Sequence, residues 1–386
     1  MIMKYFFTVL KNLYKDELLS AFFLWREKND EKSQADFLSC LYEKNAEKNF
    51  SAYVADKILY DQNAFSVACA KKQTLSPYLV KAFMQDITSV YNLLSSLDTK
   101  GMFAVGNAFF ERVFKGENTV EHLKKFYARY GYGLFIRYRA FKFENDSIIP
   151  VESPSPIQIS DLKNYEEEKK TVATNIENFL DGLPYSNMLL YGERGTGKSS
   201  TIHAMLNRYY QDGLRLVELS KENMLRLSSL KEKLKDVPLK FIIYIDDLSL
   251  SAGDERISSL KAALEGCTEG HTENAMIVAT SNRRHIIDEK FSQRNDSVHA
   301  GDSMQEELSL SDRFGISVLF STTNKEQYLS IIKQLAKDKN LTLEENELNL
   351  LAERWAIIKG GRSPRRAKQL IDLVCSLSAK GLPVTF

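Results

Sequence analysis

Residues 192–199 read Gly-Glu-Arg-Gly-Thr-Gly-Lys-Ser and match the pattern G-x-x-x-x-G-K-[ST] at every fixed position. The short apolar run at 187–191 precedes this segment and predicts a buried strand, and the residues from Ser199 to Tyr210 predict a helix. A strand, a glycine-rich loop and a helix in this order form the context in which the pattern binds phosphate. This feature therefore constrains the chain to an α/β fold built around the loop.

The residue types of this loop suit an anion. Glycines let consecutive backbone N–H groups turn toward one anion without Cβ clashes, and the N-terminus of the following helix adds partial positive charge. We expect Lys198 to reach the β- and γ-phosphates and the Ser199 hydroxyl to bind Mg²⁺. The predicted nucleotide-binding residues of the loop are Gly192, Glu193, Arg194, Gly195, Thr196, Gly197, Lys198, Ser199 and Ser200.

Two further predicted strands end in polar side chains. The apolar strand at 241–246 ends in Asp246 and is followed directly by Asp247. We expect Asp246 to hold Mg²⁺ beside Ser199, and Asp247 to orient and polarise an attacking water. The strand at 275–280 is followed by Ser281 and Asn282, whose amide can hydrogen-bond the γ-phosphate or the water.

Two arginines complete the predicted site, although each alone is a weak signal. The segment 311–315 reads Ser-Asp-Arg-Phe-Gly, and an arginine such as Arg313 can neutralise transition-state charge, often on the nucleotide of a neighbouring subunit. The segment 361–365 reads Gly-Arg-Ser-Pro-Arg and opens a predicted helix, which places Arg365 in its first turn. Other arginines that suit these two roles are Arg283, Arg284 and Arg366.

From about Gln158 to Val384 the chain resembles the AAA+ ATPases, because five motifs follow in the order of that family: GERGTGKS, IIYIDD, ATSN, SDRFG and GRSPR. The resemblance implies that the first two are Walker A and Walker B, that Asn282 is sensor 1, that Arg313 is a finger acting in trans, and that Arg365 is the sensor 2 arginine of a helical lid. It further implies a sheet order of 5-1-4-3-2, ATP and Mg²⁺ as cofactors, and head-to-tail assembly. More narrowly, the motifs resemble an uncharacterised bacterial AAA+ family of unknown role. One departure is Asp247, where the family usually has Glu.

The predicted organisation has four parts. Residues 1–145 form a mainly helical N-terminal domain, 146–160 a proline-containing linker, 161–322 the α/β nucleotide-binding domain, and 323–386 a helical lid. The predicted strands lie at 187–191, 214–219, 241–246, 275–280 and 316–320, and the lid helices near 325–337, 345–357 and 364–379. Arginines alternate with aromatic residues at 127–143, which favours a strand or hairpin with a basic side over a surface for single-stranded nucleic acid.

Composition limits the classes of function. The formal net charge of +1 gives no global attraction to nucleic acid or membrane, and no uncharged run is long enough to span a bilayer. The four cysteines are scattered, which is typical of a reducing cytosol, so we predict a cytoplasmic protein.

The function that we expect is an ATPase that couples MgATP hydrolysis to shape changes of a homo-oligomer, joined through Arg313, and of an unidentified protein or nucleic-acid client. The alternative is a nucleotide-gated binding or scaffold protein with little hydrolysis, which the shorter Asp247 keeps open. A GTPase is disfavoured because the guanine-recognition pattern N-K-x-D is not complete at Asn324-Lys325-Glu326-Gln327. A small-molecule kinase would not explain both Asn282 and Arg313.

Overall fold

The computed structural model describes residues 7–99, 101–251, 254–265, 274–282, 287–288, 310 and 312–384. The chain forms two compact units. The first contains Met1–Tyr138 and the short segment Asp236–Leu239, and the second contains Arg139–Lys235 and Lys240–Phe386. The predicted helical domain of 1–145 therefore ends about seven residues too late, because the first unit ends at Tyr138.

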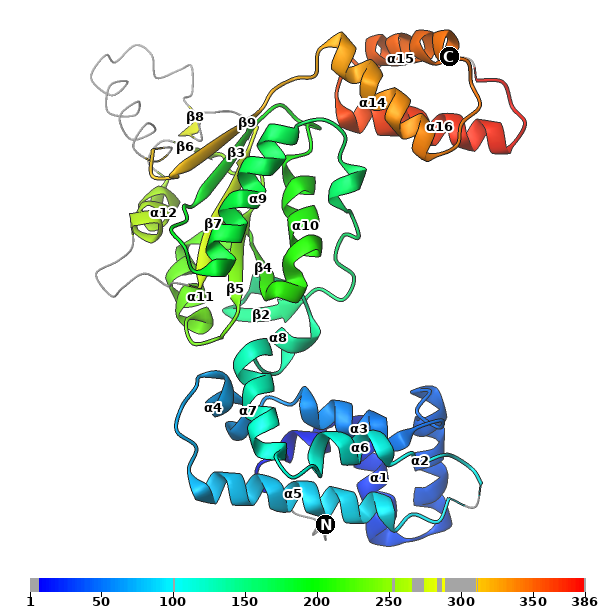
Figure 1. Ribbon diagram of the computed structural model, residues 1–386, viewed down its shortest axis with the longest axis vertical. Helices are drawn as coiled ribbons and strands as arrows, with labels where there is room; N and C mark the ends of the chain where they lie inside the picture. Colours follow the sequence, from blue (N-terminus) through cyan, green and yellow to red (C-terminus); the bar gives the residue numbers. More distant parts are fainter. Residues whose placement is uncertain are drawn as a thin grey trace. The chain divides into compact units, whose positions relative to one another are not determined.

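The first unit is helical in its described residues, as predicted (Figure 1). Its core is rich in aromatic rings: Phe37 contacts Phe22, Trp25 and Phe50, with ring centroids 5.1 to 5.5 Å apart. The helices are η1 (Lys11–Lys15), α1 (Glu17–Lys28), α2 (Glu31–Glu43), α3 (Phe50–Leu59), α4 (Ala64–Ala70), α5 (Pro77–Ser95), α6 (Ala108–Phe114), α7 (Thr119–Tyr130) and α8 (Leu134–Arg137).

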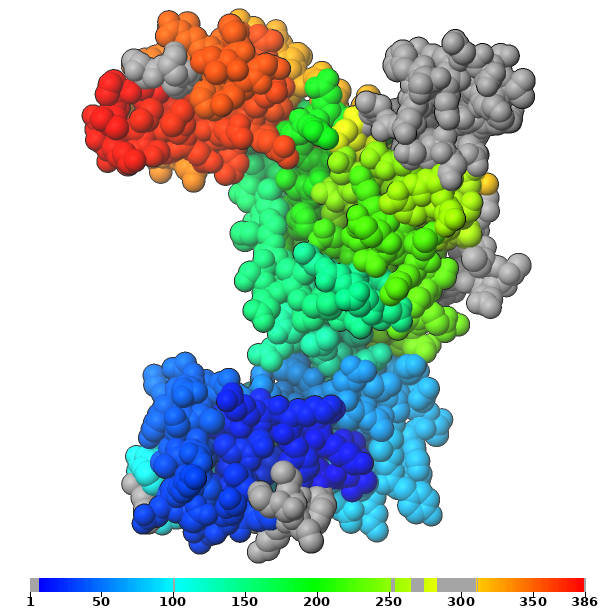
Figure 2. All heavy atoms as spheres, turned by 180° about the vertical axis from the view of Figure 1, so that it is seen from behind, coloured from blue at the N-terminus to red at the C-terminus, as the bar shows by residue number. Residues whose placement is uncertain are grey.

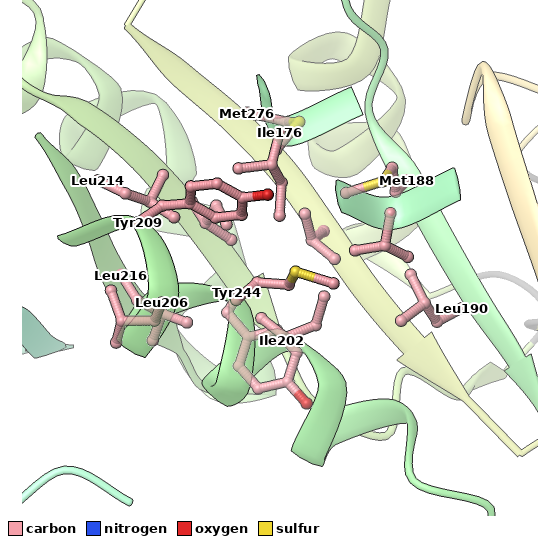
Figure 3. Packing of buried hydrophobic residues seen from close by; sticks show 14 of the residues in the cluster. Ile176, Met188, Leu190, Ile202, Leu206, Tyr209, Leu214, Leu216, Tyr244 and Met276 are labelled. Atoms are coloured by element: carbon pink, nitrogen blue, oxygen red, sulfur yellow. The ribbon is translucent and has the colours of Figure 1, made fainter. Parts of the chain in front are cut away.

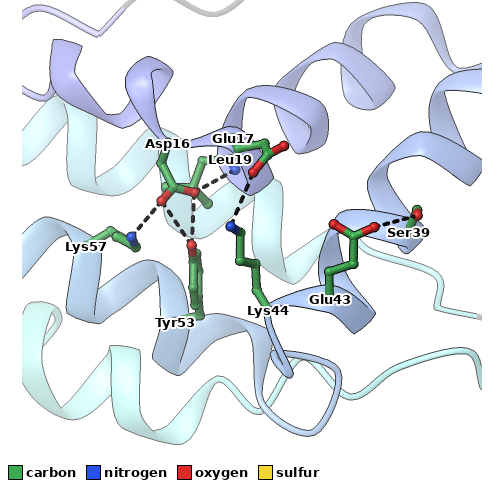
Figure 4. A network of polar contacts seen from close by, with 8 residues as sticks. All are labelled: Asp16, Glu17, Leu19, Ser39, Glu43, Lys44, Tyr53 and Lys57. Atoms are coloured by element: carbon green, nitrogen blue, oxygen red, sulfur yellow. Dashed lines mark hydrogen bonds and ion pairs between the residues drawn. The ribbon is translucent and has the colours of Figure 1, made fainter.

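A polar network ties the start of α1 to α3 (Figure 4). Asp16 caps α1 by accepting a hydrogen bond from the Leu19 N–H at 3.1 Å, and it pairs with the Lys57 ammonium at 2.6 Å. The Tyr53 hydroxyl donates to the same carboxylate at 2.9 Å. Burial alone would raise the pKa of Asp16, but these partners outweigh it and lower the pKa.

The second unit is built on a seven-stranded sheet in the order β2-β1-β4-β5-β7-β3-β9. The five predicted strands are β3 (Met188–Gly192), β4 (Leu214–Leu219), β5 (Lys240–Ile245), β7 (Ala275–Ser281) and β9 (Ile316–Phe320). They are mutually parallel and run in the order β9-β3-β7-β5-β4, so the predicted 5-1-4-3-2 arrangement is confirmed. A small parallel pair, β6 (Leu250–Ser251) with β8 (Ile287–Asp288), lies outside this sheet.

Helices cover both faces of the sheet. Figure 1 shows α9 (Glu166–Asp181) and α10 (Lys198–Tyr209) over one face. Their buried residues, such as Ile176 and Ile202, form one cluster with alternate residues of the strands, such as Leu190 and Tyr244 (Figure 3). Intervening residues of the central strands, such as Ile243 and Ile277, are also fully buried, as expected for a parallel sheet covered on both sides. Further helices in the described part of this region are η2 (Ile159–Asp161), η3 (Tyr210–Asp212), η4 (Lys221–Arg226), α11 (Leu227–Leu234) and α12 (Glu255–Glu265).

The predicted linker at 146–160 is wrong in its first part, because residues 140–150 form a hairpin that extends the sheet. Strand β1 (Ala140–Glu144) pairs in parallel with β4 and antiparallel with β2 (Ser147–Pro150). The turn between them is Asn145-Asp146, and both residues have positive φ, as a two-residue hairpin turn requires. Pro150 is compatible with β2 because β2 is an edge strand. The basic and aromatic segment at 127–143 is consequently a strand only from Ala140 onward, and its earlier part belongs to α7 and α8.

The C-terminal part of the second unit is a small helical lid, drawn orange to red in Figures 1 and 2. It contains α14 (Lys325–Asp338), α15 (Glu345–Ile358) and α16 (Pro364–Ala379), close to the predicted bounds. These helices share their own apolar cluster, which includes Tyr328, Ala352 and Leu370. The lid therefore has a core separate from that of the sheet.

Candidate nucleotide site

The glycine-rich loop connects β3 to α10 and requires glycine for steric reasons. Gly192 has φ 134°, and a Cβ there would lie 2.1 Å from the Phe320 carbonyl oxygen of the neighbouring strand β9. Gly195 has φ 82°, and a Cβ there would approach the Arg365 side chain at 3.1 Å. The loop is thus packed between β9 on one side and the start of α16 on the other, with its backbone in conformations that other residues rarely adopt.

Lys198 is folded back over this loop. Its ammonium donates to the carbonyl oxygens of Gly192 at 2.7 Å and Glu193 at 2.8 Å. Burial lowers the pKa of Lys198, while the carboxylates of Asp247 and Asp246 act in the opposite direction. The ammonium is therefore buried at the N-terminus of α10, and its hydrogen-bond partners among the described residues are carbonyl oxygens, an arrangement that favours an incoming anion.

Asp246 follows the last residue of β5 and is fixed by three hydroxyl groups. Its Oδ1 atom accepts hydrogen bonds from Ser199 at 2.8 Å, Tyr244 at 2.7 Å and Thr280 at 2.6 Å. Burial raises the pKa of this carboxyl group, but the hydrogen bonds from Thr280, Tyr244 and Ser199 outweigh it, and the net pKa is lowered. Asp246 is consequently held in its charged form beside the Ser199 hydroxyl.

Asp247 has an unusual backbone, with φ 50° in the left-handed region. Two contacts hold it there: its N–H donates to the Thr280 hydroxyl at 2.9 Å, and the Asn282 amide donates to its carboxylate. The two residues predicted to handle the attacking water and the γ-phosphate are therefore in direct contact, through the adjacent strands β5 and β7.

Arg365 lies where the lid meets the loop. Ser363 caps α16 through its side chain, Pro364 takes the first helical position, and the Arg365 N–H donates to the Gly195 carbonyl at 3.2 Å. This backbone contact places the start of α16 directly against the loop.

These residues surround one cavity of about 1060 Å³. Its lining includes the predicted residues Arg194, Gly195, Thr196, Gly197, Lys198, Ser199, Ser200, Asp246, Asp247, Asn282 and Arg365. Gly192 and Glu193 are not part of the lining and instead hold Lys198. Arg313 does not line the cavity either. The alternatives Arg283 and Arg284 lie outside the described residues.

The donor set fits MgATP in its chemistry. Within the described residues, no group of three or more His, Cys, Asp or Glu side chains is placed to hold a metal ion by itself. Ser199 and Asp246 offer one hydroxyl and one carboxylate, which suits Mg²⁺, since this ion usually takes its other ligands from phosphate and water. The glycine backbone that a Cβ would obstruct, together with Lys198, suits the phosphates.

Several residues of the site were not predicted from the sequence. Tyr244 and Thr280 bond Asp246 from the adjacent strands β5 and β7. The far wall comes from the lid and from the segment before α9, with Ile331, Leu335, Ile371, Leu162 and Tyr165 among its residues. No local pattern marks those residues, because they meet only through the tertiary fold.

A comparison with models of known protein families identifies the family of this chain. Residues 136–377, more than half of the chain, match the family model described as "Protein of unknown function (DUF815)". The chain belongs to this family. The match covers the hairpin, the sheet, the glycine-rich loop and most of the C-terminal helices, so the DUF815 region contains the parallel sheet and the loop.

Two solved structures are similar to part of the chain at low sequence identity. The Holliday junction branch migration motor RuvB of Thermotoga maritima is 17% identical with a TM-score of 0.41, over 59% of this chain and 67% of that chain. The ORC1 protein of Aeropyrum pernix, solved in complex with DNA, is 17% identical with a TM-score of 0.43, over 57% of this chain and 62% of that chain. At these values the similarities carry no inference about activity.

No curated protein matches the chain. Among the helices that the structure describes, none combines the length and the apolar character needed to cross a membrane.

Proposed function

We propose that this DUF815 protein binds MgATP in the cavity and hydrolyses it, and that a second copy of the chain completes the site. The observation that supports this most strongly is the convergence of the glycine-rich loop, Asp246, Asp247, Asn282 and Arg365 on one cavity, from four separate stretches of sequence. A chance phosphate loop would not bring a metal-binding carboxylate and a γ-phosphate amide to the same place.

The residues have distinct roles in this proposal. Lys198 and the loop N–H groups bind the phosphates, and Ser199 and Asp246 hold Mg²⁺, which supplies charge neutralisation at the phosphates. Asp247 accepts a hydrogen bond from the attacking water and so orients it. Asn282 donates its amide to the γ-phosphate or the water, and Arg365 joins the nucleotide to the lid.

Assembly follows from the position of Arg313. This arginine is absent from the cavity lining of its own chain, which supports a role at the nucleotide of a neighbouring copy. We therefore expect a homo-oligomer in which each Arg313 serves the site of the next chain. The assignment of 161–322 as the motor and 323–386 as the lid, and the cytoplasmic location, are further parts of the proposal.

We assign the unidentified protein or nucleic-acid client to the N-terminal helical unit, because the residues that line the nucleotide cavity all belong to the second unit. An Asp247→Asn variant is expected to keep ATP bound and to hold its client. Identifying what is recovered with this variant from cell extract, but not with Lys198→Ala, would name the client class.

A nucleotide-gated binding protein with little hydrolysis is the second candidate, and one contact favours it. The Asp247 carboxylate accepts a hydrogen bond from Asn282, so in this conformation the groups assigned to the water and to the γ-phosphate are bonded to each other. Under this alternative, ATP binding would change the lid without turnover.

Equilibrium binding and turnover distinguish these functions. Binding of ATP that Lys198→Ala abolishes supports both candidates, and its absence in the wild-type protein overturns both. ATP hydrolysis above the Lys198→Ala background supports the ATPase, whereas tight binding without hydrolysis at any protein concentration supports the gated binding protein.

A further inference from the structure

Tyr244 lies two residues before Asp246 on β5, so the two side chains leave the strand on the same face. The Tyr244 hydroxyl donates to Asp246 Oδ1 at 2.7 Å. This tyrosine is therefore bonded to the carboxylate that we assign to Mg²⁺, although it does not line the cavity itself.

The ring of Tyr244 is fixed by the core. Only 1% of the residue is exposed, and it belongs to the apolar cluster between the sheet and α10, where Figure 3 shows it beside Ile202. The His203 ring lies against it in an edge-to-face arrangement with centroids 5.8 Å apart. Because His203 is on α10, the helix that begins at Lys198, the ring is held by the same helix that carries the phosphate loop's lysine and serine.

The hydroxyl has one clear task in this environment. A buried phenol needs a hydrogen-bond partner, and the partner here is a charged carboxylate. Together with Ser199 and Thr280, it brings three donors to one oxygen of Asp246. The three donors thus restrict the rotation of the carboxylate.

We infer that Tyr244 is a positioning residue for the magnesium site, an inference that rests on the proposed function. Mg²⁺ requires near-ideal octahedral geometry, so a carboxylate that is fixed in advance binds it better than one that rotates. Hydrogen bonds that orient a metal-binding carboxylate typically change metal affinity by about 10- to 100-fold. Tyr244 acts through Asp246 and does not touch the nucleotide.

The test is a magnesium titration of nucleotide binding, with no turnover involved. A fluorescent, non-hydrolysable ATP analogue is bound to the full chain, first in EDTA and then with increasing Mg²⁺. The variant is Tyr244→Phe, which removes only the hydroxyl. The matched control is Tyr209→Phe, because Tyr209 lies in the same apolar cluster and donates to a different carboxylate, Glu177.

For Tyr244→Phe we expect unchanged analogue affinity in EDTA and an increase of about 10-fold in the Mg²⁺ concentration at half-saturation. Tyr209→Phe should match the wild-type protein in both. Equal Mg²⁺ dependence of Tyr244→Phe and the wild-type protein overturns the inference. If Mg²⁺ has no effect on binding of the analogue by the wild-type protein, the inference is also overturned, but nucleotide binding is not. If the wild-type protein does not bind the analogue at all, the proposed function is overturned as well.

A second pair of variants covers the case in which Tyr244→Phe does not fold. Thr280→Val removes another donor to the same oxygen, and Thr280→Ser keeps it. The same titration should show a raised Mg²⁺ requirement for Thr280→Val alone. Identical Mg²⁺ dependence of the two variants would contradict the idea that this set of donors positions Asp246.

Discussion

Thr280 connects the two acidic residues of the site. Two substitutions of Thr280 distinguish the contribution of its side-chain shape to stability from that of its hydrogen bonds. Its hydroxyl donates to Asp246 at 2.6 Å and accepts from the Asp247 N–H at 2.9 Å, and only 1% of the residue is exposed. Thr280→Val keeps the volume and the β-branch but removes both bonds. Thr280→Ser removes a methyl group but keeps both bonds.

The expected magnitudes follow from these contacts. A hydrogen bond to a charged group contributes about 1.5–3 kcal/mol, and a buried N–H left without a partner costs about 1–3 kcal/mol. Because the two effects share one residue and are not additive, we expect Thr280→Val to lower the free energy of unfolding by about 3 kcal/mol. Loss of one buried methyl group in Thr280→Ser should cost only about 1 kcal/mol.

Hydrogen exchange of the β5 and β7 amides is the suitable assay, because it reports the unfolding of the second unit separately from the helical unit. Thr280→Val, which preserves the side-chain shape better, should thus be about 2 kcal/mol less stable than Thr280→Ser. A Thr280→Val protein as stable as Thr280→Ser, or more stable, would refute the bridging role of the hydroxyl.

Three other predictions concern the finger, the loop and the first unit. Arg313→Ala should keep ATP binding and lose about 10³-fold in turnover, and mixing it with Lys198→Ala should restore part of the activity; no recovery in the mixture would argue against action in trans. Gly192→Ala should prevent folding or lower the stability by more than about 3 kcal/mol, since its Cβ meets a backbone oxygen at 2.1 Å. Gly182→Ala, with open space around the new Cβ, should lower the stability measured by thermal unfolding by about 1 kcal/mol. Similar losses of stability in the two variants would contradict the close packing at Gly192. Asp16→Asn should lower the free energy of unfolding by about 1 kcal/mol at neutral pH. Because the folded-state pKa of Asp16 is lowered, the stabilisation by its carboxylate is present above the unfolded-state pKa of about 4 and is lost as the pH falls through the lower folded-state pKa. The difference between the variant and the wild-type protein in urea unfolding should therefore disappear in acid, and a difference that persists there would contradict the charge argument.

Much of the second unit was predictable because its signals are local. The loop pattern, the apolar strands and the caps of the lid helices each depend on residues close together in sequence, and the predicted strands agree with the observed ones within about one residue at each end. The strand order came from the resemblance to the AAA+ family, since no local signal specifies which strands are neighbours.

The hairpin shows a signal that was present but outweighed. Phe141 and Phe143 alternate with polar residues, and Asn145-Asp146 is a turn sequence, yet the prolines that follow favoured a linker over residues 146–160. Because β2 is an edge strand, Pro150 removes no hydrogen bond of the sheet. The low strand propensity of proline therefore did not prevent β2 from forming.

The site was predictable in its charged residues and not in their supports. Lys198, Asp246 and Asn282 have motif positions, but the hydroxyl donors Tyr244 and Thr280 lie inside apolar strands, where they resemble ordinary core residues. Their roles depend on which atoms the fold brings within hydrogen-bond distance. The same reason applies to the contact between the start of α16 and the loop, which joins residues about 170 positions apart.

The most direct test of the central claim is the rate of ATP hydrolysis per chain, measured with Mg²⁺ over a wide range of protein concentration and compared with Lys198→Ala. A site completed by Arg313 of a second copy predicts a rate that rises with concentration and then reaches a plateau as the oligomer forms. A rate above the Lys198→Ala background that is independent of concentration, down to dilutions where the chain is monomeric, would contradict the composite site. No rate above that background at any concentration would contradict the ATPase itself.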